Sequence, residues 1–114
     1  MLKQLIAAGA DINKYNKFGY TPLYRAIWNG HSRCAKILID AGADVNYPCQ
    51  YGWSPLHGAT RCGHIDCVKV LLKAGAEINS RDINGMTPLQ MATVYEHRKI
   101  CALLKAAEAQ LKSV

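Results

Sequence analysis

Apolar residues recur along the chain at helical spacing, in short blocks separated by polar segments that contain glycine. The blocks that include Ala35–Leu38 and Val68–Leu72 are too apolar to be stable as isolated helices, so each must bury its faces against neighbouring elements. We therefore expect paired short helices joined by projecting turns. The first helices are expected near 22–29, 55–62 and 88–95, the second helices near 32–41, 65–74 and 98–110, and the turns around 13–20, 46–53 and 79–86.

Hydroxyl and glycine residues mark the ends of these helices. Thr21, Ser54 and Thr87 each precede a proline, which is typical of a hydroxyl N-cap followed by proline at the first helical position. Glycines follow the apolar blocks, where a residue that tolerates the left-handed conformation ends a helix. Those after the first helices are Gly30 and Gly63, and those after the second helices are Gly9, Gly42 and Gly75.

One five-residue motif occurs three times at a fixed interval. Gly19-Tyr20-Thr21-Pro22-Leu23 returns as 52–56 and again as 85–89, each time 33 residues later. Self-similarity at this period indicates an array of stacked helical units, in which each unit contacts only its neighbours. Such an array presents a repeated surface rather than a single buried pocket.

Further motifs repeat in register with the first one: an alanine at Ala26, Ala59 and Ala92, a Gly-His pair at 30–31 and 63–64 that becomes Glu96-His97, and a Gly-Ala-acid-apolar-Asn closure at 9–13, 42–46 and 75–79. Together these motifs resemble the ankyrin repeat over nearly the whole chain. The resemblance implies an all-α solenoid of stacked helix-turn-helix units with projecting β-turns. The period match to this family is a known signature.

The repeat register predicts one ankyrin repeat domain over residues 1–114. It consists of a partial N-terminal repeat, 1–16, two full repeats, 17–49 and 50–82, and a C-terminal capping repeat, 83–114. Leu2, Leu5 and Ile6 align with a second helix whose first-helix partner is absent, so we expect the chain to belong to a larger chain or complex. In the last repeat Glu96 replaces a glycine and Ala106-Ala107-Glu108 replaces the closure, which predicts an atypical, longer final helix.

Composition indicates in which cellular compartment the protein is expected. The chain has 114 residues, half of them hydrophobic, and no segment approaches the roughly 18 apolar residues of a membrane span. Its five cysteines follow repeat positions rather than a disulfide framework, and Met1-Leu2-Lys3 does not begin a secretory signal. We therefore expect an intracellular protein, cytoplasmic or nuclear, with no membrane association.

The sequence offers one arrangement that resembles a metal site. Cys62, His64 and Cys67 form C-x-H-x-x-C, with His57 shortly before it. His64 belongs to the repeat, however, and Cys67 aligns with Ile100, so structural roles are favoured for both. No nucleophile motif, phosphate-binding glycine loop or paired carboxylates are visible. We expect no metal, no cofactor and no enzymatic activity.

When the repeats are aligned, some positions carry a different residue type in each repeat. These variable columns indicate where a partner is expected to bind. The resemblance implies that these columns form a concave binding surface from the turns and the exposed side of the first helices. Carried over residue by residue, the candidate partner-binding residues are Lys17, Phe18, Tyr20, Trp28, Asn29, Gln50, Tyr51, Trp53, Arg61, Asn84, Met86 and Tyr95. Six of the nine aromatic residues fall in this set.

These rings have two interpretations. They can pack on one another and stabilise the stack, or they can contact a partner, since Trp, Tyr and Arg dominate interface hot spots. We favour binding, with Tyr20, Trp28, Trp53 and Arg61 as the anchors. Tyr24, Tyr15 and Tyr47 are open to a purely structural role.

The distribution of charged residues indicates the chemistry of the expected partner. The net charge is +6, and many bases fall on the predicted second helices, where a solvated outer face explains them. The variable columns carry Lys17 and Arg61 against few acids. The favoured function is thus a non-catalytic adaptor or scaffold that binds a protein or peptide segment with an apolar anchor and acidic residues. The alternatives are a nucleic-acid-binding surface, which the separation of bases from rings makes unfavourable, and a purely structural cap of a longer array.

Overall fold

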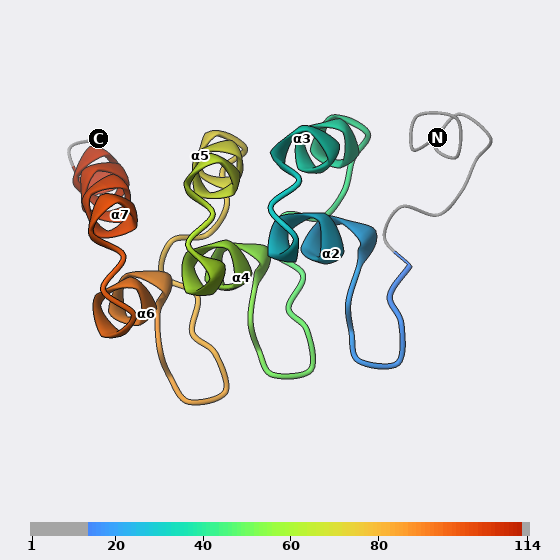
Figure 1. Ribbon diagram of the computed structural model, residues 1–114, viewed down its shortest axis with the longest axis horizontal. Helices are drawn as coiled ribbons and strands as arrows, with labels where there is room; N and C mark the ends of the chain where they lie inside the picture. The colour runs from blue at the N-terminus through green and yellow to red at the C-terminus, as the bar shows by residue number, and fades with distance from the viewer. Residues whose placement is uncertain (1–13, 113–114) are drawn as a thin grey trace.

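The computed structural model describes residues 14–112, and all of its helices pack as two layers (Figure 1). The lower layer in Figure 1 holds α2 (Pro22–Trp28), α4 (Pro55–Cys62) and α6 (Pro88–Val94), and the upper layer holds α3 (Ser32–Asp40), α5 (Ile65–Lys73) and α7 (Arg98–Lys112). Each helix predicted from the sequence is present, with ends within two residues of the expected ones. The described residues contain no strand, which confirms the all-α solenoid.

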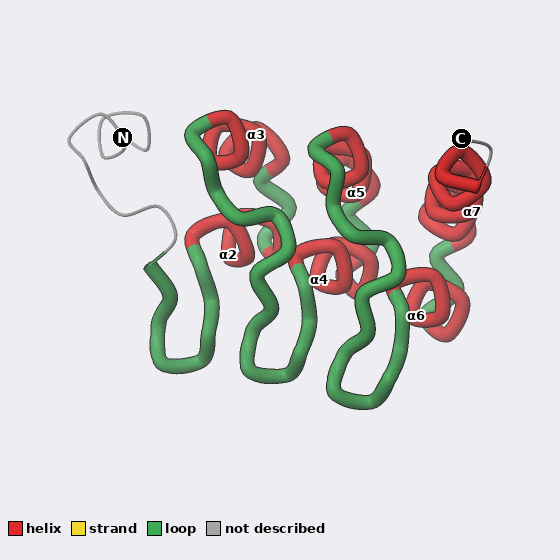
Figure 2. The backbone as a smooth tube through the Cα atoms, turned by 180° about the vertical axis from the view of Figure 1, so that it is seen from behind, coloured by secondary structure: helices red, strands yellow, loops and turns green. Residues whose placement is uncertain are grey.

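Long loops connect one pair of helices to the next. They project from the lower layer side by side and in the same direction (Figure 2). The hydroxyls of Thr21, Ser54 and Thr87 accept hydrogen bonds from the backbone amides three residues later, as the Ser/Thr-Pro motif predicts. Gly63 caps α4 in the left-handed conformation, with φ 75°. The sequence signals for helix ends therefore act as expected.

The core runs along the array between the two layers. Fully buried Leu23, Leu56, Leu71 and Leu104 belong to one continuous apolar cluster that extends through the described repeats. Helix α4 packs against α2, α5 and α6, so each unit is held by its neighbours on both sides. This linear core fixes the spacing between successive turns.

Hydrogen bonds across the repeats set the register of the array. The amide of Gln50 donates to Phe18 O at 3.0 Å, and the amide of Ile83 donates to Tyr51 O at 3.2 Å. In the helical layer, His64 Nε2 donates to Trp28 O at 3.0 Å. Each turn is thus tied to the turn before it, and a side chain on one turn lies beside its counterparts.

The replacement of a glycine by Glu96 has a structural explanation. Gly30 and Gly63 have φ near 75°, and a Cβ on Gly30 would lie 2.9 Å from the His64 ring of the next repeat. Glu96 has the same left-handed backbone, φ 59°, but no further histidine packs on it among the described residues. The side chain is therefore tolerated there.

Helix α7 continues to Lys112, which confirms the longer final helix. The predicted partial repeat, including Leu2, Leu5, Ile6 and Gly9, lies outside the described residues. The boundaries proposed for the four repeats stay predictions. The described residues contain no helix with both the length and the apolar character that a membrane crossing requires.

Candidate functional site

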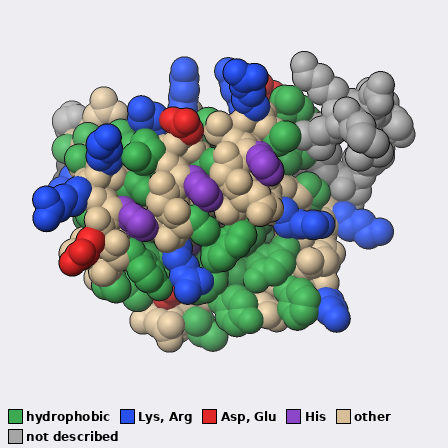
Figure 3. Space-filling model, viewed as in Figure 1, with side chains coloured by type: hydrophobic (Ala, Val, Ile, Leu, Met, Phe, Trp, Pro, Cys, Tyr) green, Lys and Arg blue, Asp and Glu red, His purple; other side chains and the backbone are tan. Residues whose placement is uncertain are grey.

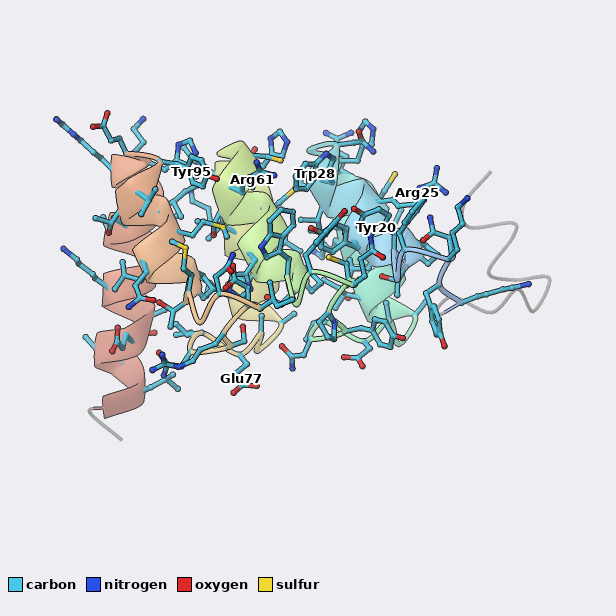
Figure 4. All side chains as sticks on the ribbon, turned by 90° about the horizontal axis from the view of Figure 1, so that it is seen from below. Tyr20, Arg25, Trp28, Arg61, Glu77 and Tyr95 are labelled. Carbon is cyan, nitrogen blue, oxygen red and sulfur yellow. The ribbon has the colours of Figure 1, made fainter. Side chains whose placement is uncertain are left out.

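Aromatic side chains from the turns and the lower helices meet on one face of the array. Viewed from below, Tyr95, Arg61, Trp28 and Tyr20 lie in a row across three helical pairs (Figure 4). We call this surface the ring face and define it by the side chains that contact one another there: Lys17, Phe18, Tyr20, Trp28, Tyr51, Trp53, Arg61 and Tyr95.

A ladder of stacked rings, which includes the buried Tyr24, joins three members of the ring face, Tyr20, Trp28 and Trp53. Tyr20 stacks on Tyr24 with centroids 5.1 Å apart, and Tyr24 lies 6.1 Å from Trp28, its neighbour one helical turn away. Trp28 in turn lies 6.1 Å from Trp53 of the next repeat, with an angle of 11° between the two planes. The ladder therefore joins two repeats.

Tyr24 is the buried member of the ladder. Its ring packs on Gly58, where a Cβ would lie only 3.3 Å from the Tyr24 ring. This contact explains a glycine inside α4, where glycine weakens the helix. Burial raises the pKa of the Tyr24 hydroxyl. Tyr24 thus has the structural role that the sequence left open.

Trp53 is held by a carboxylate that the sequence analysis did not select. Its indole Nε1 donates to Asp82 Oδ2 at 3.1 Å, while Asp82 Oδ1 accepts from the amides of Asn84 and Met86, each at 2.9 Å. Burial alone would raise the pKa of this carboxyl, but the hydrogen bonds outweigh it and lower the pKa below the usual value. Asp82 therefore orients Trp53 and closes the third turn.

A repeat signal for Asp82 was present in the sequence. Asn16, two repeats earlier, occupies the same position, and its Oδ1 accepts from the amides of Phe18 and Tyr20. Asn and Asp close turns through such bonds to the backbone. The middle turn has Cys49 at this position, which obscures the pattern.

Arg61 lies among three rings. Its Cζ is 4.9 Å from the Trp53 centroid and 5.7 Å from the centroids of both Trp28 and Tyr95. Arg61 Nε also donates to Tyr95 Oη at 3.2 Å. These distances place the guanidinium within reach of three cation–π interactions, which hold a half-buried cation at the middle of the ring face.

The outer rings of this face are more exposed. Phe18 is 41% exposed and Tyr51 is 45% exposed, and both lie on projecting turns. The ring centroids of Tyr51 and Trp53 are 5.3 Å apart, and Lys17 Nζ lies 5.1 Å from the centroid of the Phe18 ring. The ring face thus combines a packed centre with an exposed edge.

The remaining candidates lie around this face rather than within it. Asn29 donates through Nδ2 to Arg25 O and lines a hollow with Tyr20 and Trp28. Gln50 and Asn84 are exposed on the second and third turns. Met86 is half-buried, and its carbonyl, rather than its side chain, has a clear role as the acceptor for His57.

His57 and His64, considered as metal ligands, are engaged with the backbone. His57 Nε2 donates to Met86 O at 2.8 Å, so its Nδ1 accepts from the Ser54 hydroxyl and amide. Burial lowers the pKa of His57, and burial raises the pKa of the Cys67 thiol to about 11. No set of three or more potential ligands for a metal ion gathers in residues 14–112.

Basic side chains form a separate surface on the upper layer. They are exposed on α3, α5 and α7, namely Arg33, Lys36, Lys69, Lys73, Arg98, Lys99 and Lys105. Figure 3 shows basic side chains along the upper edge and hydrophobic ones gathered below, over the turns. Bases and rings are therefore mostly on different sides of the array.

Comparison with known proteins agrees with this architecture. A family model described as ankyrin repeats (3 copies) matches residues 1–82, and a second, ankyrin repeats (many copies), matches residues 63–104. No curated protein matches the chain. Ankyrin repeats are generally non-catalytic modules that bind other proteins. With two family models covering residues 1–104, the chain belongs to the ankyrin repeat family.

Proposed function

We propose that the ring face is the site at which this array binds a segment of another protein, as an adaptor or scaffold without catalysis. The observation that carries the proposal is the continuous set of rings around Arg61, which draws side chains from three successive repeats. Packing of the stack alone does not require exposed rings such as Phe18 and Tyr51.

The arrangement favours binding because its central side chains are already fixed. Trp53 is held by Asp82, and Arg61 is held by Tyr95, so few rotamers are lost when a partner binds. The expected ligand is a protein segment with an apolar anchor for the rings and acidic residues for the cations. We also propose a cytoplasmic or nuclear location, which the five unpaired cysteines support.

Nucleic acid is the competing partner. A nucleic-acid groove needs bases along the phosphate backbone next to stacking rings, whereas most of the exposed bases in residues 14–112 lie on α3, α5 and α7. The two partner classes differ in their dependence on salt, because counterion release makes nucleic-acid binding weaken steeply as salt rises.

The test is capture from a cell extract by three forms of the chain at low and high salt. The first form is native, and the second carries Phe18→Ser and Tyr51→Ser on the exposed edge of the ring face. The third is a matched control with Lys36→Ser and Lys69→Ser on the upper layer. Circular dichroism verifies that all three forms are folded.

We expect the native and upper-layer forms to retain the same protein at both salt concentrations and the ring-face form to lose it. Retention of that protein by the ring-face form would contradict the proposal. Capture of nucleic acid that high salt and the upper-layer substitutions remove would favour the competing function.

A further inference from the structure

Arg61 is a half-buried cation whose cation–π contacts and side-chain hydrogen bond within residues 14–112 are all made with aromatic residues. Its partners are the rings of Trp28, Trp53 and Tyr95 and the hydroxyl of Tyr95, and none is a carboxylate. Charged side chains that are withdrawn from water usually have a partner of opposite charge. An anion from outside the described residues would complete this one.

The guanidinium is already oriented for such an anion. The hydroxyl of Tyr95 uses the Nε–H group, which leaves the two terminal amino groups with their four N–H donors. In the described residues, no side-chain nitrogen of Arg61 is both buried and without a hydrogen-bond partner. The terminal nitrogens of Arg61 are therefore not sealed inside the protein. A planar guanidinium with free terminal donors matches the two oxygens of a carboxylate.

The charges around Arg61 favour an acidic ligand. Arg25 is exposed beside Tyr20 and Trp28 (Figure 4), and the exposed Lys17 has its Nζ 5.1 Å from the centroid of the Phe18 ring. Asp82, which accepts hydrogen bonds from Trp53 and from two backbone amides, contributes one negative charge against the positive charges of Lys17, Arg25 and Arg61. The local charge that a partner meets is therefore positive.

An apolar hollow lies next to this cation. It has a volume of about 250 Å³ and is lined by Tyr20, Tyr24, Arg25, Trp28 and Asn29. Trp28 belongs both to this hollow and to the cage around Arg61, and in Figure 4 it lies between Arg61 and Tyr20. A segment that fills the hollow with one side chain would bring a neighbouring side chain to Arg61.

We infer that Arg61 binds the carboxylate of an aspartate or glutamate in the partner segment, beside an apolar residue of the same segment that occupies the hollow at Trp28. The inference rests on the proposed function and adds the chemistry of its ligand. Arg61 thereby determines specificity for an acidic segment.

The test begins with selection from a random dodecapeptide library displayed on phage, with the native chain as the target. A selected peptide is synthesised in three versions, in which the acidic position is Glu, Gln or phosphoserine. Each is titrated against the native chain, Arg61→Gln, Arg61→Lys and a control, Arg33→Gln, which removes an exposed arginine of α3.

We expect the selected peptides to share an acidic residue close to a large apolar one. Replacing Glu by Gln weakens binding to the native chain and to Arg33→Gln about tenfold or more. The same replacement has no effect on Arg61→Gln, because the group that reads the carboxylate is already missing. Arg61→Lys keeps part of the preference, since lysine retains the charge without the planar fork.

Equal loss on replacement of Glu in the native chain and in Arg61→Gln would overturn the inference. So would selected peptides without an acidic residue, or phosphoserine binding more than tenfold tighter than Glu through Arg61, which would assign the site to phosphate.

Failure of the proposed function itself is recognised separately. If the selected peptides bind Phe18→Ser/Tyr51→Ser as tightly as the native chain, or if selection yields no binding peptide, the ring face is not the binding site. The inference about Arg61 then falls with it.

Discussion

At the scale of single residues, Asp82 fixes the position of Trp53. Asp82→Asn keeps one oxygen for the amides of Asn84 and Met86 but replaces the acceptor of the Trp53 indole by a donor. We expect the free energy of unfolding in urea to fall by about 1 kcal/mol in Asp82→Asn and by about 3 kcal/mol in Asp82→Ala, which loses all three hydrogen bonds.

The indole N–H signal of Trp53 provides an independent measure of the same bond. In a ¹H–¹⁵N spectrum it should exchange with solvent faster in Asp82→Asn than in the native chain. Equal stabilities of Asp82→Asn and Asp82→Ala would show that the turn gains nothing from the carboxyl oxygen that the backbone amides share.

His57 makes stability depend on pH. Its pKa is lowered in the folded state by burial, so the neutral ring stabilises the fold fully above the ordinary value near 6.5. That contribution is lost as pH falls through the lowered value. We therefore expect the free energy of unfolding to decrease as pH is lowered from 7 toward 5.

The variant His57→Gln tests the assignment, because Gln90 already fills the corresponding position beside Thr87 with its oxygen accepting from the cap amide. At pH 7 it should be less stable by about 1 kcal/mol, since the bond to Met86 O is lost. Its stability should vary less with pH between 7 and 5, and an unchanged slope would assign the pH dependence to another group.

At the scale of the elements, two glycines with the same backbone differ in their surroundings. Gly52 and Gly85 have φ 74° and 80° at equivalent positions of successive turns. A Cβ on Gly52 would lie 2.8 Å from the Ile83 amide nitrogen of the next turn, whereas a Cβ on Gly85 would have nothing within 4 Å. The difference between the two sites is thus the contact between turns.

Alanine at each site separates backbone strain from that contact. Gly85→Ala should lose about 1 kcal/mol of unfolding free energy, the cost of a left-handed alanine. Gly52→Ala should lose about 2 kcal/mol more, because the Ile83 backbone must move. Thermal and urea unfolding measure both, and equal losses would mean that adjacent turns are not in firm contact.

Most of the fold could be predicted at this scale, because helix boundaries are encoded locally. A hydroxyl residue followed by proline, as in Ser54-Pro55, starts each of α2, α4 and α6, and Gly63 ends α4 in a left-handed backbone conformation. The tolerance of Glu96 for a left-handed backbone could not be predicted in the same way, because it depends on whether a histidine of a following repeat packs there.

At the scale of the whole molecule, the repeat register predicted which columns face the turns but not how their side chains meet. Arg61 and Tyr95 are 34 residues apart, and the bond between them depends on rotamers that no repeat pattern specifies. The need for glycine at position 58 is likewise explained only by the contact with the Tyr24 ring of the preceding repeat. The sequence therefore predicted which positions lie on the candidate surface, but not the contacts between their side chains.

The central claim concerns where a partner binds, and the two tryptophans of the chain report on it directly. The measurement is a ¹H–¹⁵N spectrum of the labelled protein with and without a saturating selected peptide. We predict that the indole signals of Trp28 and Trp53 and the Arg61 Nε–H signal shift, while the amide signals of Lys36 and Lys69 on the upper layer do not. Shifts confined to α3, α5 and α7, with both indole signals unchanged, would contradict the account.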